Sequence, residues 1–344
     1  MELRPSDAQQ LLVDSFAAMY AKESSSERVR AAEPLGFDRR LWDQLLALGS
    51  LSMAVPEASG GWGASVLDLA LVAEQHGRAL GSAPLIETQV ACRLLARAGA
   101  PAADVLGAAL AGDRLVTLAL RLPRNGVAQL VPAGAVASDV IVLHGGGLVV
   151  IPTGDDRILP ENLGSMPLAD VPLSDAALSA GTALAEGESA AALLDAALDD
   201  WLVLTAAALV GIAERSVEIG VAYAREREAF GEKIGGFQAV GHRLADSATT
   251  ADGAGLLARE AAWSFNDEPK RSAELAAMAF AFAAATARDA SDWALHFHGG
   301  YGFMLEYDIQ LYYRRARAWA NVVMSPAAAR RRVADLRYGP PGAR

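Results

Sequence analysis

Two segments of the sequence combine residue types that could bind a ligand. Residues 225–246 read REREAFGEKIGGFQAVGHRLAD and place charged residues and glycines around an Arg-x-x-Phe-Gly run. Because glycine allows backbone angles that other residues resist, this segment, taken alone, is most simply a salt-bridged turn between two helices. Residues 296–319 read HFHGGYGFMLEYDIQLYYRRARAW, and we expect a long helix to stop at Gly299 and Gly300. Glycines at such a point also let a ligand approach the backbone.

Metal and phosphate binding are the other chemistries that these residue types allow. His296 and His298 could ligate a metal, but residues two apart on a helix do not share a face, and no further ligands stand at a fitting spacing. We therefore expect no metal site. The basic clusters RRARAW (314–319) and RRR (330–332) could hold a phosphate, although most such clusters are solvated helix faces.

Composition narrows the class of protein. The chain has 344 residues and a formal net charge of −11, which argues against a wide nucleic-acid-binding face. Its one cysteine, Cys92, fits a reducing cytoplasm. The longest apolar runs, at 201–213 and 275–287, have 13 residues each, whereas a membrane span needs about 20. The N-terminus lacks the pattern of a signal peptide, so we expect a cytoplasmic protein that does not bind a membrane.

Hydrophobic periodicity divides the chain into three predicted domains. Residues 1–112 have mainly helical patterns. Residues 113–186 contain short apolar runs, among which DVIVLHGGGLVVIP (139–152) predicts two strands around a glycine turn. SAGTALAEGESA (179–190) predicts a linker. Residues 187–344 are helical, with helices of about 30 residues that indicate an antiparallel bundle.

Three motifs, in this order along the chain, resemble the signatures of the acyl-CoA dehydrogenase family of flavoproteins. Residues 45–80 resemble the N-terminal signature, a loop with Pro-Glu and Gly-Gly followed by a helix that ends in a Glu-x-x-Gly-Arg run. Residues 223–246 resemble the signature that enters the C-terminal bundle, and residues 296–317 resemble the final Gln-x-x-Gly-Gly-x-Gly segment. The resemblance implies a mainly α-helical fold, with a helical N-terminal domain, a small central β-barrel and a C-terminal four-helix bundle.

The resemblance also implies that FAD binds between the middle and C-terminal domains and across a subunit interface. Arg227 matches the family arginine that holds the FAD pyrophosphate, a role that suits a guanidinium because it pairs with phosphate oxygens bidentately. Phe230 and Gln238 match residues that line the adenine and pyrophosphate region. Gly299 and Gly300 match the backbone turn against the adenosine half.

In the family reaction, two hydrogens leave an acyl-CoA thioester. A carboxylate takes the α-proton, and flavin N5 accepts hydride from the β-carbon. The base needs a raised pKa in a desolvated pocket, which suits glutamate. The two family positions for this glutamate are occupied by Val323 and Trp201, so neither holds a carboxylate. We expect Trp201 to pack in the core or else to fill the acyl slot.

Asp199 and Asp200 directly precede the second of these positions. One residue on a helix corresponds to about 100° of rotation, so we expect both side chains to face elsewhere. The simplest interpretation is a pair of solvated acids near a helix start, where the helix dipole favours them. The alternative is that one of the two acts as the base.

The chain departs from the family pattern in two further places. His296 stands where the family usually has glutamine, although it can still donate a hydrogen bond. After residues 115–120 the sequence reads RLPRNGVAQLVPAG, with nothing like the Thr-Glu-Pro-x-x-Gly-Ser-Asp stretch that contacts flavin and substrate in the family. In these features the chain resembles the shorter, base-lacking subunit of heteromeric actinobacterial acyl-CoA dehydrogenases that degrade steroid side chains.

The sequence therefore predicts a subunit that contacts FAD while a second acyl-CoA dehydrogenase chain of a heterotetramer supplies the base. The expected substrate is a bulky acyl-CoA, and the expected electron acceptor is an electron-transfer flavoprotein. Three alternatives stay open. They are a self-sufficient homotetramer with an unrecognised base, a flavin-free scaffold of the same fold, and a related flavin monooxygenase or oxidase.

Overall fold

The computed structural model describes residues 3–339, which form two compact units. The bundle unit comprises the described residues up to Ser26, Ala70–Gly81 and the described residues from Leu202 onward. The sheet unit comprises Glu27–Leu69 and Ser82–Trp201. The division into three domains at residues 112 and 186 remains a prediction, whereas the mainly helical fold class is confirmed.

The sheet unit combines short helices with six short strands. Its helices are α2 (Ser26–Ala32), α3 (Arg39–Ala47), α5 (Leu85–Ala98), α6 (Ala103–Leu110), α7 (Asp175–Ser179) and the start of α8 (Gly187–Glu226), with 3-10 turns at Ser52–Ala54, Glu57–Ser59 and Ala100–Ala102. Its strands are β1 (Val116–Leu118), β2 (Val127–Val131), β3 (Asp139–His144), β4 (Gly147–Pro152), β5 (Ala169–Pro172) and β6 (Thr182–Glu186). Apolar side chains from both sheets, such as Val140, Ile151 and Val171, share one buried core.

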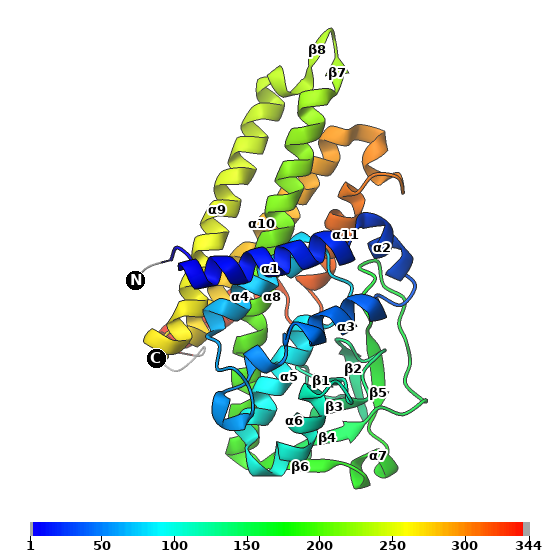
Figure 1. Cartoon of the computed structure of the whole chain (residues 1–344), viewed down its shortest axis with the longest axis vertical. Coiled ribbons are helices and arrows are strands. Elements are labelled where there is room, and N and C mark those ends of the chain that lie inside the picture. The colour runs from blue at the N-terminus through cyan, green and yellow to red at the C-terminus, as the bar shows by residue number, and fades with distance from the viewer. Residues whose placement is uncertain (1–2, 340–344) are drawn as a thin grey trace. The chain divides into compact units, whose positions relative to one another are not determined.

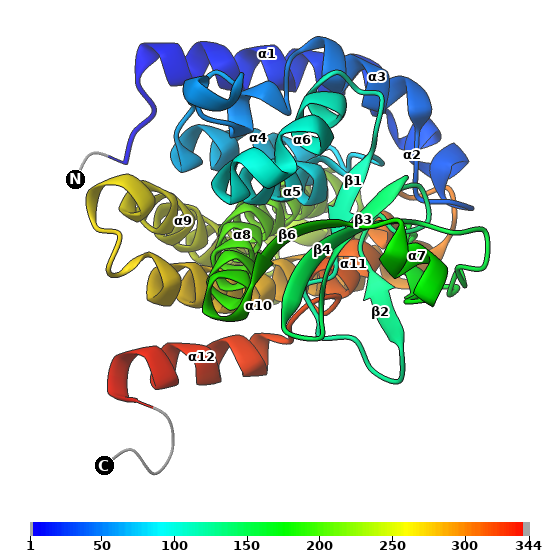
Figure 2. The same ribbon diagram turned by 90° about the horizontal axis from the view of Figure 1, so that it is seen from below.

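The strands form two sheets, and those described do not close into a barrel. One sheet has the order β1-β3-β4-β6, with β1 parallel to β3 and the other pairs antiparallel (Figure 2). β2 and β5 pair separately as an antiparallel two-stranded sheet. The barrel implied by the family resemblance is therefore open here, because strands of three to six residues offer too few pairing positions to continue round.

The predicted hairpin at 139–152 is confirmed, but the predicted linker is wrong. β3 and β4 pair throughout their lengths, and the turn glycines Gly145 and Gly146 have φ angles of 59° and 82°. Two positive φ angles are what a two-residue hairpin turn needs. Thr182–Glu186, inside the predicted linker, is the edge strand β6 and pairs with β4. Its only buried side chain is Leu184, so the sequence shows no apolar alternation.

The bundle unit consists almost entirely of helices. They are α1 (Asp7–Glu23), α4 (Val66–Arg78), the rest of α8, α9 (Gln238–Asp267), α10 (Ser272–His298), α11 (Ile309–Trp319) and α12 (Pro326–Tyr338), with a hairpin of β7 (Glu228–Ala229) and β8 (Glu232–Lys233) and 3-10 turns η4 (Ile234–Gly236) and η5 (Gly299–Phe303). α10 packs against α9, α11 and α12 (Figure 1). Most of its buried side chains are alanines, which let neighbouring helices approach closely.

α8 is a 40-residue helix with a mainly apolar sequence. By length and composition it could cross a membrane, but 83% of its most apolar 18-residue stretch is buried within the protein. That burial indicates a core helix. It also agrees with the expectation, drawn from the apolar run at 201–213, of a buried helix.

α4 and α8 contact each other backbone to backbone inside the bundle unit. A Cβ atom at Gly77 would lie 1.8 Å from the carbonyl oxygen of Ala208, and one at Gly211 would lie 2.0 Å from the carbonyl oxygen of Glu74. Real Cβ atoms essentially never approach another atom closer than 3.0 Å. The two helices therefore cross at a separation that only glycine permits, which explains the glycine in the Glu-x-x-Gly-Arg run.

We expect Gly211→Ala to destabilise the chain by about 1–3 kcal/mol, because the new methyl group must push α4 and α8 apart. Urea unfolding followed by circular dichroism measures the loss. Gly253→Ala on α9 is the matched control, since its Cβ would meet only the Phe282 ring at an ordinary 3.7 Å. The control should be neutral or slightly stabilising. Equal midpoints for the two variants would contradict the close crossing.

Candidate cofactor-binding site

One pocket of the bundle unit gathers three of the predicted FAD-contacting residues. It has a volume of about 920 Å³, and Phe230, Gln238 and His296 all line it. The other large side chains of its wall are Phe237, His242, Arg243, Asp246, Trp293 and Phe297. Residues from the Arg-x-x-Phe-Gly segment and from the end of α10, more than 50 residues apart in sequence, thus face one cavity.

The hairpin between α8 and α9 presents Phe230 to this pocket. Glu228 and Lys233 pair across β7 and β8 through an ion pair of 2.6 Å, which leaves Phe230 and Gly231 as the two-residue turn. Phe230 has a φ angle of +55°, which is costly for a bulky residue. Phe230 is 97% exposed, and its ring meets the Phe237 ring in a T-shaped contact with 6.3 Å between ring centroids. A strained backbone that holds an apolar ring in the open is typical of a ligand contact.

Aromatic and cationic groups alternate along the opposite wall. The Trp293 ring stacks on Phe297, with 6.0 Å between ring centroids, and the Arg243 guanidinium lies 4.8 Å from the Trp293 centroid. His296 meets the Trp293 ring edge-on at 5.7 Å. Such a wall suits a planar aromatic group joined to an anionic one, because the rings can stack and the cation can pair with charge.

Arg227 and the Gly-Gly turn lie next to each other but outside the lining of this pocket. The Arg227 guanidinium lies 5.9 Å from the centroid of the Tyr301 ring, in the turn η5 that begins at Gly299. Gly299 has a φ angle of +60°, and a Cβ at Gly299 or Gly300 would meet no atom within 4 Å. Open space beside two glycines and a nearby guanidinium fits a phosphate approaching the backbone. The predicted residues are therefore consistent with FAD.

The two histidines of the second segment have different surroundings. His296 is exposed on the pocket. His298 is buried, with its ring stacked 3.9 Å from Tyr223 and its Nδ1 2.7 Å from the Ala294 carbonyl oxygen. Burial lowers the pKa of His298 below its usual value. No group of three or more potential metal-ligating side chains occurs within residues 3–339.

Asp200 is not the solvated acid that the sequence predicted. Inside the sheet unit its carboxylate accepts hydrogen bonds from Arg93 at 3.0 and 3.2 Å and from Arg97 at 2.5 Å. Burial alone would raise the pKa of Asp200, but the two guanidinium groups outweigh burial and hold it below its usual value. An ionised carboxylate held by two arginines is a poor general base. Asp199, beside it, is half-buried.

The two family positions for the base carry apolar side chains in the structure as in the sequence. Trp201 is 1% exposed in the sheet unit, which confirms its prediction as a core residue. Val323 is half-buried in the bundle unit, in the loop between α11 and α12. Neither position offers a proton acceptor.

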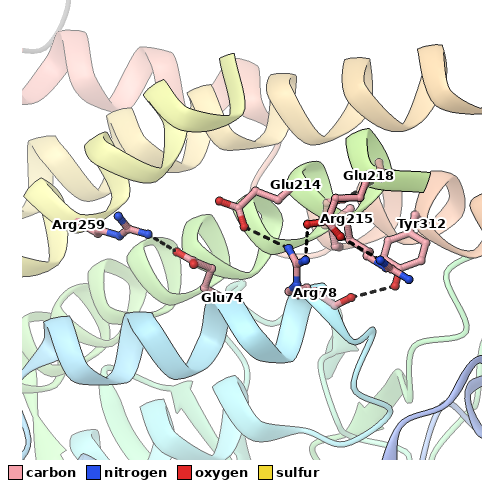
Figure 3. Close-up of polar contacts among 9 residues, drawn as sticks. Glu74, Arg78, Glu214, Arg215, Glu218, Arg259 and Tyr312 are labelled. Atoms are coloured by element: carbon pink, nitrogen blue, oxygen red, sulfur yellow. Dashed lines mark hydrogen bonds and ion pairs between the residues drawn. The ribbon is translucent and has the colours of Figure 1, made fainter. Parts of the chain in front are cut away.

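Glu74 and Arg78 of the N-terminal signature belong to a network of charged side chains in the bundle unit (Figure 3). Arg259 of α9 donates to Glu74 at 3.3 Å. Arg78 pairs with Glu214 of α8 at 3.5 Å and also with Glu218. These contacts tie α4 to α8 and α9, so the signature residues have a structural role.

Two glutamates that the sequence did not single out have strongly raised pKa values. Burial, then the charge of Glu74, raise the pKa of Glu214 to about 7, although Arg78 acts in the opposite direction. Burial raises the pKa of Glu87, in the first turn of α5, to about 7. A pKa near neutrality suits a general base. Neither glutamate could be predicted from the sequence, because burial depends on residues far along the chain.

We expect Glu214→Gln to stabilise the chain by about 1–3 kcal/mol at pH 8 and to have little effect at pH 5. The folded-state pKa of Glu214 lies above the ordinary value of 4.5. The stability that protonated Glu214 contributes is therefore fully present below pH 4.5 and is lost as the pH rises through 7, where the folded chain must hold an ionised carboxylate. Urea midpoints at the two pH values measure the difference.

Glu218→Gln is the control of opposite sign. Arg78 and Arg215 outweigh burial and lower the pKa of Glu218, so its stabilisation is present above its ordinary pKa. This variant should lose stability at pH 8. An equal gain of the Glu214 variant at pH 5 and pH 8 would show that Glu214 stays ionised.

Comparison with known proteins identifies the family. The acyl-CoA dehydrogenase N-terminal domain matches residues 6–104, and the C-terminal domain matches residues 194–320. Acyl-CoA dehydrogenase IpdE2 of Mycobacterium tuberculosis is 29% identical, over 96% of this chain and 98% of that protein. Acyl-CoA dehydrogenase FadE27 of the same organism is 31% identical, over 82% of this chain and 83% of that protein.

Solved structures agree with the sequence relatives. The ChsE4-ChsE5 complex from Mycobacterium tuberculosis aligns with a TM-score of 0.87 and 26% identity, over 99% of this chain and 100% of that one. The Tcur3481-Tcur3483 steroid ACAD G363A variant aligns with a TM-score of 0.84 and 26% identity, over 96% and 97%. With both terminal domains matched over most of the chain, the protein belongs to the acyl-CoA dehydrogenase family, oxidoreductases that act on CH–CH groups.

Proposed function

We propose that this chain is one subunit of a heteromeric, FAD-dependent acyl-CoA dehydrogenase, and that a second chain of the same family supplies the catalytic carboxylate. The proposal rests on a contrast between two parts of the reaction, the binding of the cofactor and the removal of the α-proton by a base. The aromatic pocket around Phe230 fits a cofactor. Both positions for the base, Trp201 and Val323, are apolar.

The cofactor half rests on groups that this chain provides. Arg227 would neutralise the pyrophosphate, while Phe230 and Trp293 offer ring surfaces and Gln238 and His296 offer hydrogen bonds. When bound, FAD would supply the acceptor for the hydride that leaves the β-carbon. The exposed ring of Phe230 would then be covered, which removes the cost of holding it in water.

The base half is missing from this chain at the family positions. Asp200, the nearest acid in sequence to Trp201, is already held by Arg93 and Arg97. A carboxylate from another chain would therefore take the α-proton. Two solved relatives, the ChsE4-ChsE5 complex and the Tcur3481-Tcur3483 steroid ACAD, each pair two differently named chains, which supports such pairing.

We further propose that the substrate is a bulky acyl-CoA whose acyl group derives from a steroid, since one of these relatives is a steroid ACAD. An electron-transfer flavoprotein would receive the electrons, and the complex would work in the cytoplasm. A self-sufficient homotetramer is the second candidate. Glu87 favours it, because its pKa of about 7 would suit the α-proton transfer.

An absorption spectrum of the chain, purified alone and co-purified with the second chain, tests the proposal. We expect flavin only in the complex, at fewer than one per chain, and bleaching of that flavin by acyl-CoA. Flavin in the lone chain that acyl-CoA bleaches would instead support the homotetramer. Absence of flavin from both preparations would support a scaffold, and reduction only by an external reductase would support a monooxygenase or oxidase.

Arg227→Gln should weaken FAD binding about 10- to 100-fold in the assembly that holds flavin, since a hydrogen bond between charged groups contributes roughly 1.5–3 kcal/mol. Equilibrium dialysis against FAD measures the change. Arg225→Gln is the matched control, because Arg225 has the same charge in the last turn of α8 and is exposed. Equal affinities for the two variants would remove Arg227 from the site.

A further inference from the structure

The two basic clusters of the sequence meet at one pocket of the bundle unit. Arg317 comes from the cluster at 314–319, Arg330 comes from the cluster at 330–332, and Arg288 joins them from α10. The pocket has a volume of about 460 Å³ and is bounded by α10, α11 and α12. α12 packs against α10, and Figure 2 shows the two helices next to each other.

Small side chains keep this pocket open between the arginines. The alanines of its wall are Ala284, Ala285, Ala316, Ala320 and Ala327. The alanine side chains are short and uncharged, so they neither fill the space nor neutralise a guanidinium. No aspartate or glutamate belongs to the lining. A cavity with three cations and no carboxylate on its wall favours an anionic occupant.

The three arginines differ in how firmly they are held. The Arg317 guanidinium lies 3.5 Å from the centroid of the Tyr313 ring and donates to the Tyr313 carbonyl oxygen at 3.2 Å. Stacking of this kind fixes the guanidinium in place. Asp292, outside the lining, also pairs with Arg317 at 3.3 Å.

The other two guanidinium groups have more freedom to bind. Arg288 donates its Nε to the adjacent Asp289 at 2.7 Å, and the charge of Asp292 also acts on it. Its two terminal nitrogens form no hydrogen bond within residues 3–339. The Arg330 side chain forms no hydrogen bond or ion pair within residues 3–339, and it is exposed. An exposed arginine without a partner at the mouth of a pocket can pair bidentately with an anion.

A phosphate group matches these donors better than a single carboxylate does. A phosphate monoester carries close to two negative charges at neutral pH and three acceptor oxygens. Ser325, also in the lining, accepts a hydrogen bond from the Ala328 backbone at 3.2 Å through its hydroxyl oxygen. The hydroxyl proton of Ser325 therefore remains available to donate a hydrogen bond to the phosphate, as a fourth contact beside the three arginines.

We propose that the pocket of Arg288, Arg317 and Arg330 binds the phosphate monoester group of an organic ligand, at a site separate from the proposed FAD site. Along α10, Arg288 precedes His296 of the aromatic pocket by eight residues, or about 12 Å of helix. The ligand chemistry can come from the 3′-phosphate of coenzyme A or from another phosphorylated metabolite. The inference does not depend on the proposed function.

Calorimetric titration with inorganic phosphate at constant ionic strength tests the site. The full chain is used in the assembly that holds FAD, or alone if no assembly does. We expect saturable binding that Arg330→Gln weakens about tenfold and that Arg330→Lys weakens less. Arg331→Gln is the matched control, because Arg331 is an exposed arginine on the same helix but lies outside the lining. Its affinity should match that of the wild type.

Three results would overturn the proposal. They are no heat of binding at millimolar phosphate, equal affinities of the Arg330→Gln and Arg331→Gln variants, and loss of phosphate binding when FAD is saturating. The last result would assign the pocket to the cofactor. Coenzyme A and 3′-dephospho-coenzyme A then separate the two sources. Only coenzyme A should lose affinity in Arg330→Gln if its 3′-phosphate is the ligand, whereas unchanged affinity of both indicates another phosphorylated metabolite. An equal loss of both would assign the site to the pyrophosphate that they share and would also overturn the proposal.

Discussion

Two glycines, Gly77 on α4 and Gly211 on α8, let each helix touch the backbone of the other. Helices this close leave little room for water between them. The charged side chains around the crossing must therefore be neutralised by one another. Arg78 and Arg259 meet this need for the glutamates of α4 and α8. The raised pKa of Glu214 reflects burial first and the charge of the neighbouring Glu74 second.

The environment of each acid in this chain decides what it can do. Asp200 is buried but held by two arginines, so it stays ionised and fixed. Glu214 is half-buried, and burial with the charge of Glu74 makes it easily protonated, yet its place in the ion-pair network commits it to structure. Acids are thus plentiful, but none stands at a family position for the base. Cofactor-side features and a missing base are what one member of a shared active site would have.

Local signals in the sequence predicted some features well and others not at all. Features that depend on residues near in sequence were predicted well. The β3–β4 hairpin forms around its glycine turn, and Phe230 and Gln238 line the same pocket. The burial of Asp200 depends on Arg93, which lies 107 residues earlier. β6 could not be predicted for a similar reason. It is an edge strand that forms only because it pairs with β4, about 30 residues earlier in the sequence.

Alanine richness shapes the surface between α10, α11 and α12. A methyl group fills a helix contact but stops short of a neighbouring space, so rows of alanine leave a recess wherever three helices diverge. A single larger residue, for example leucine at Ala284 or Ala320, would fill that recess without replacing any arginine. The recess can therefore be opened or closed by replacing one alanine, independently of the charges around it.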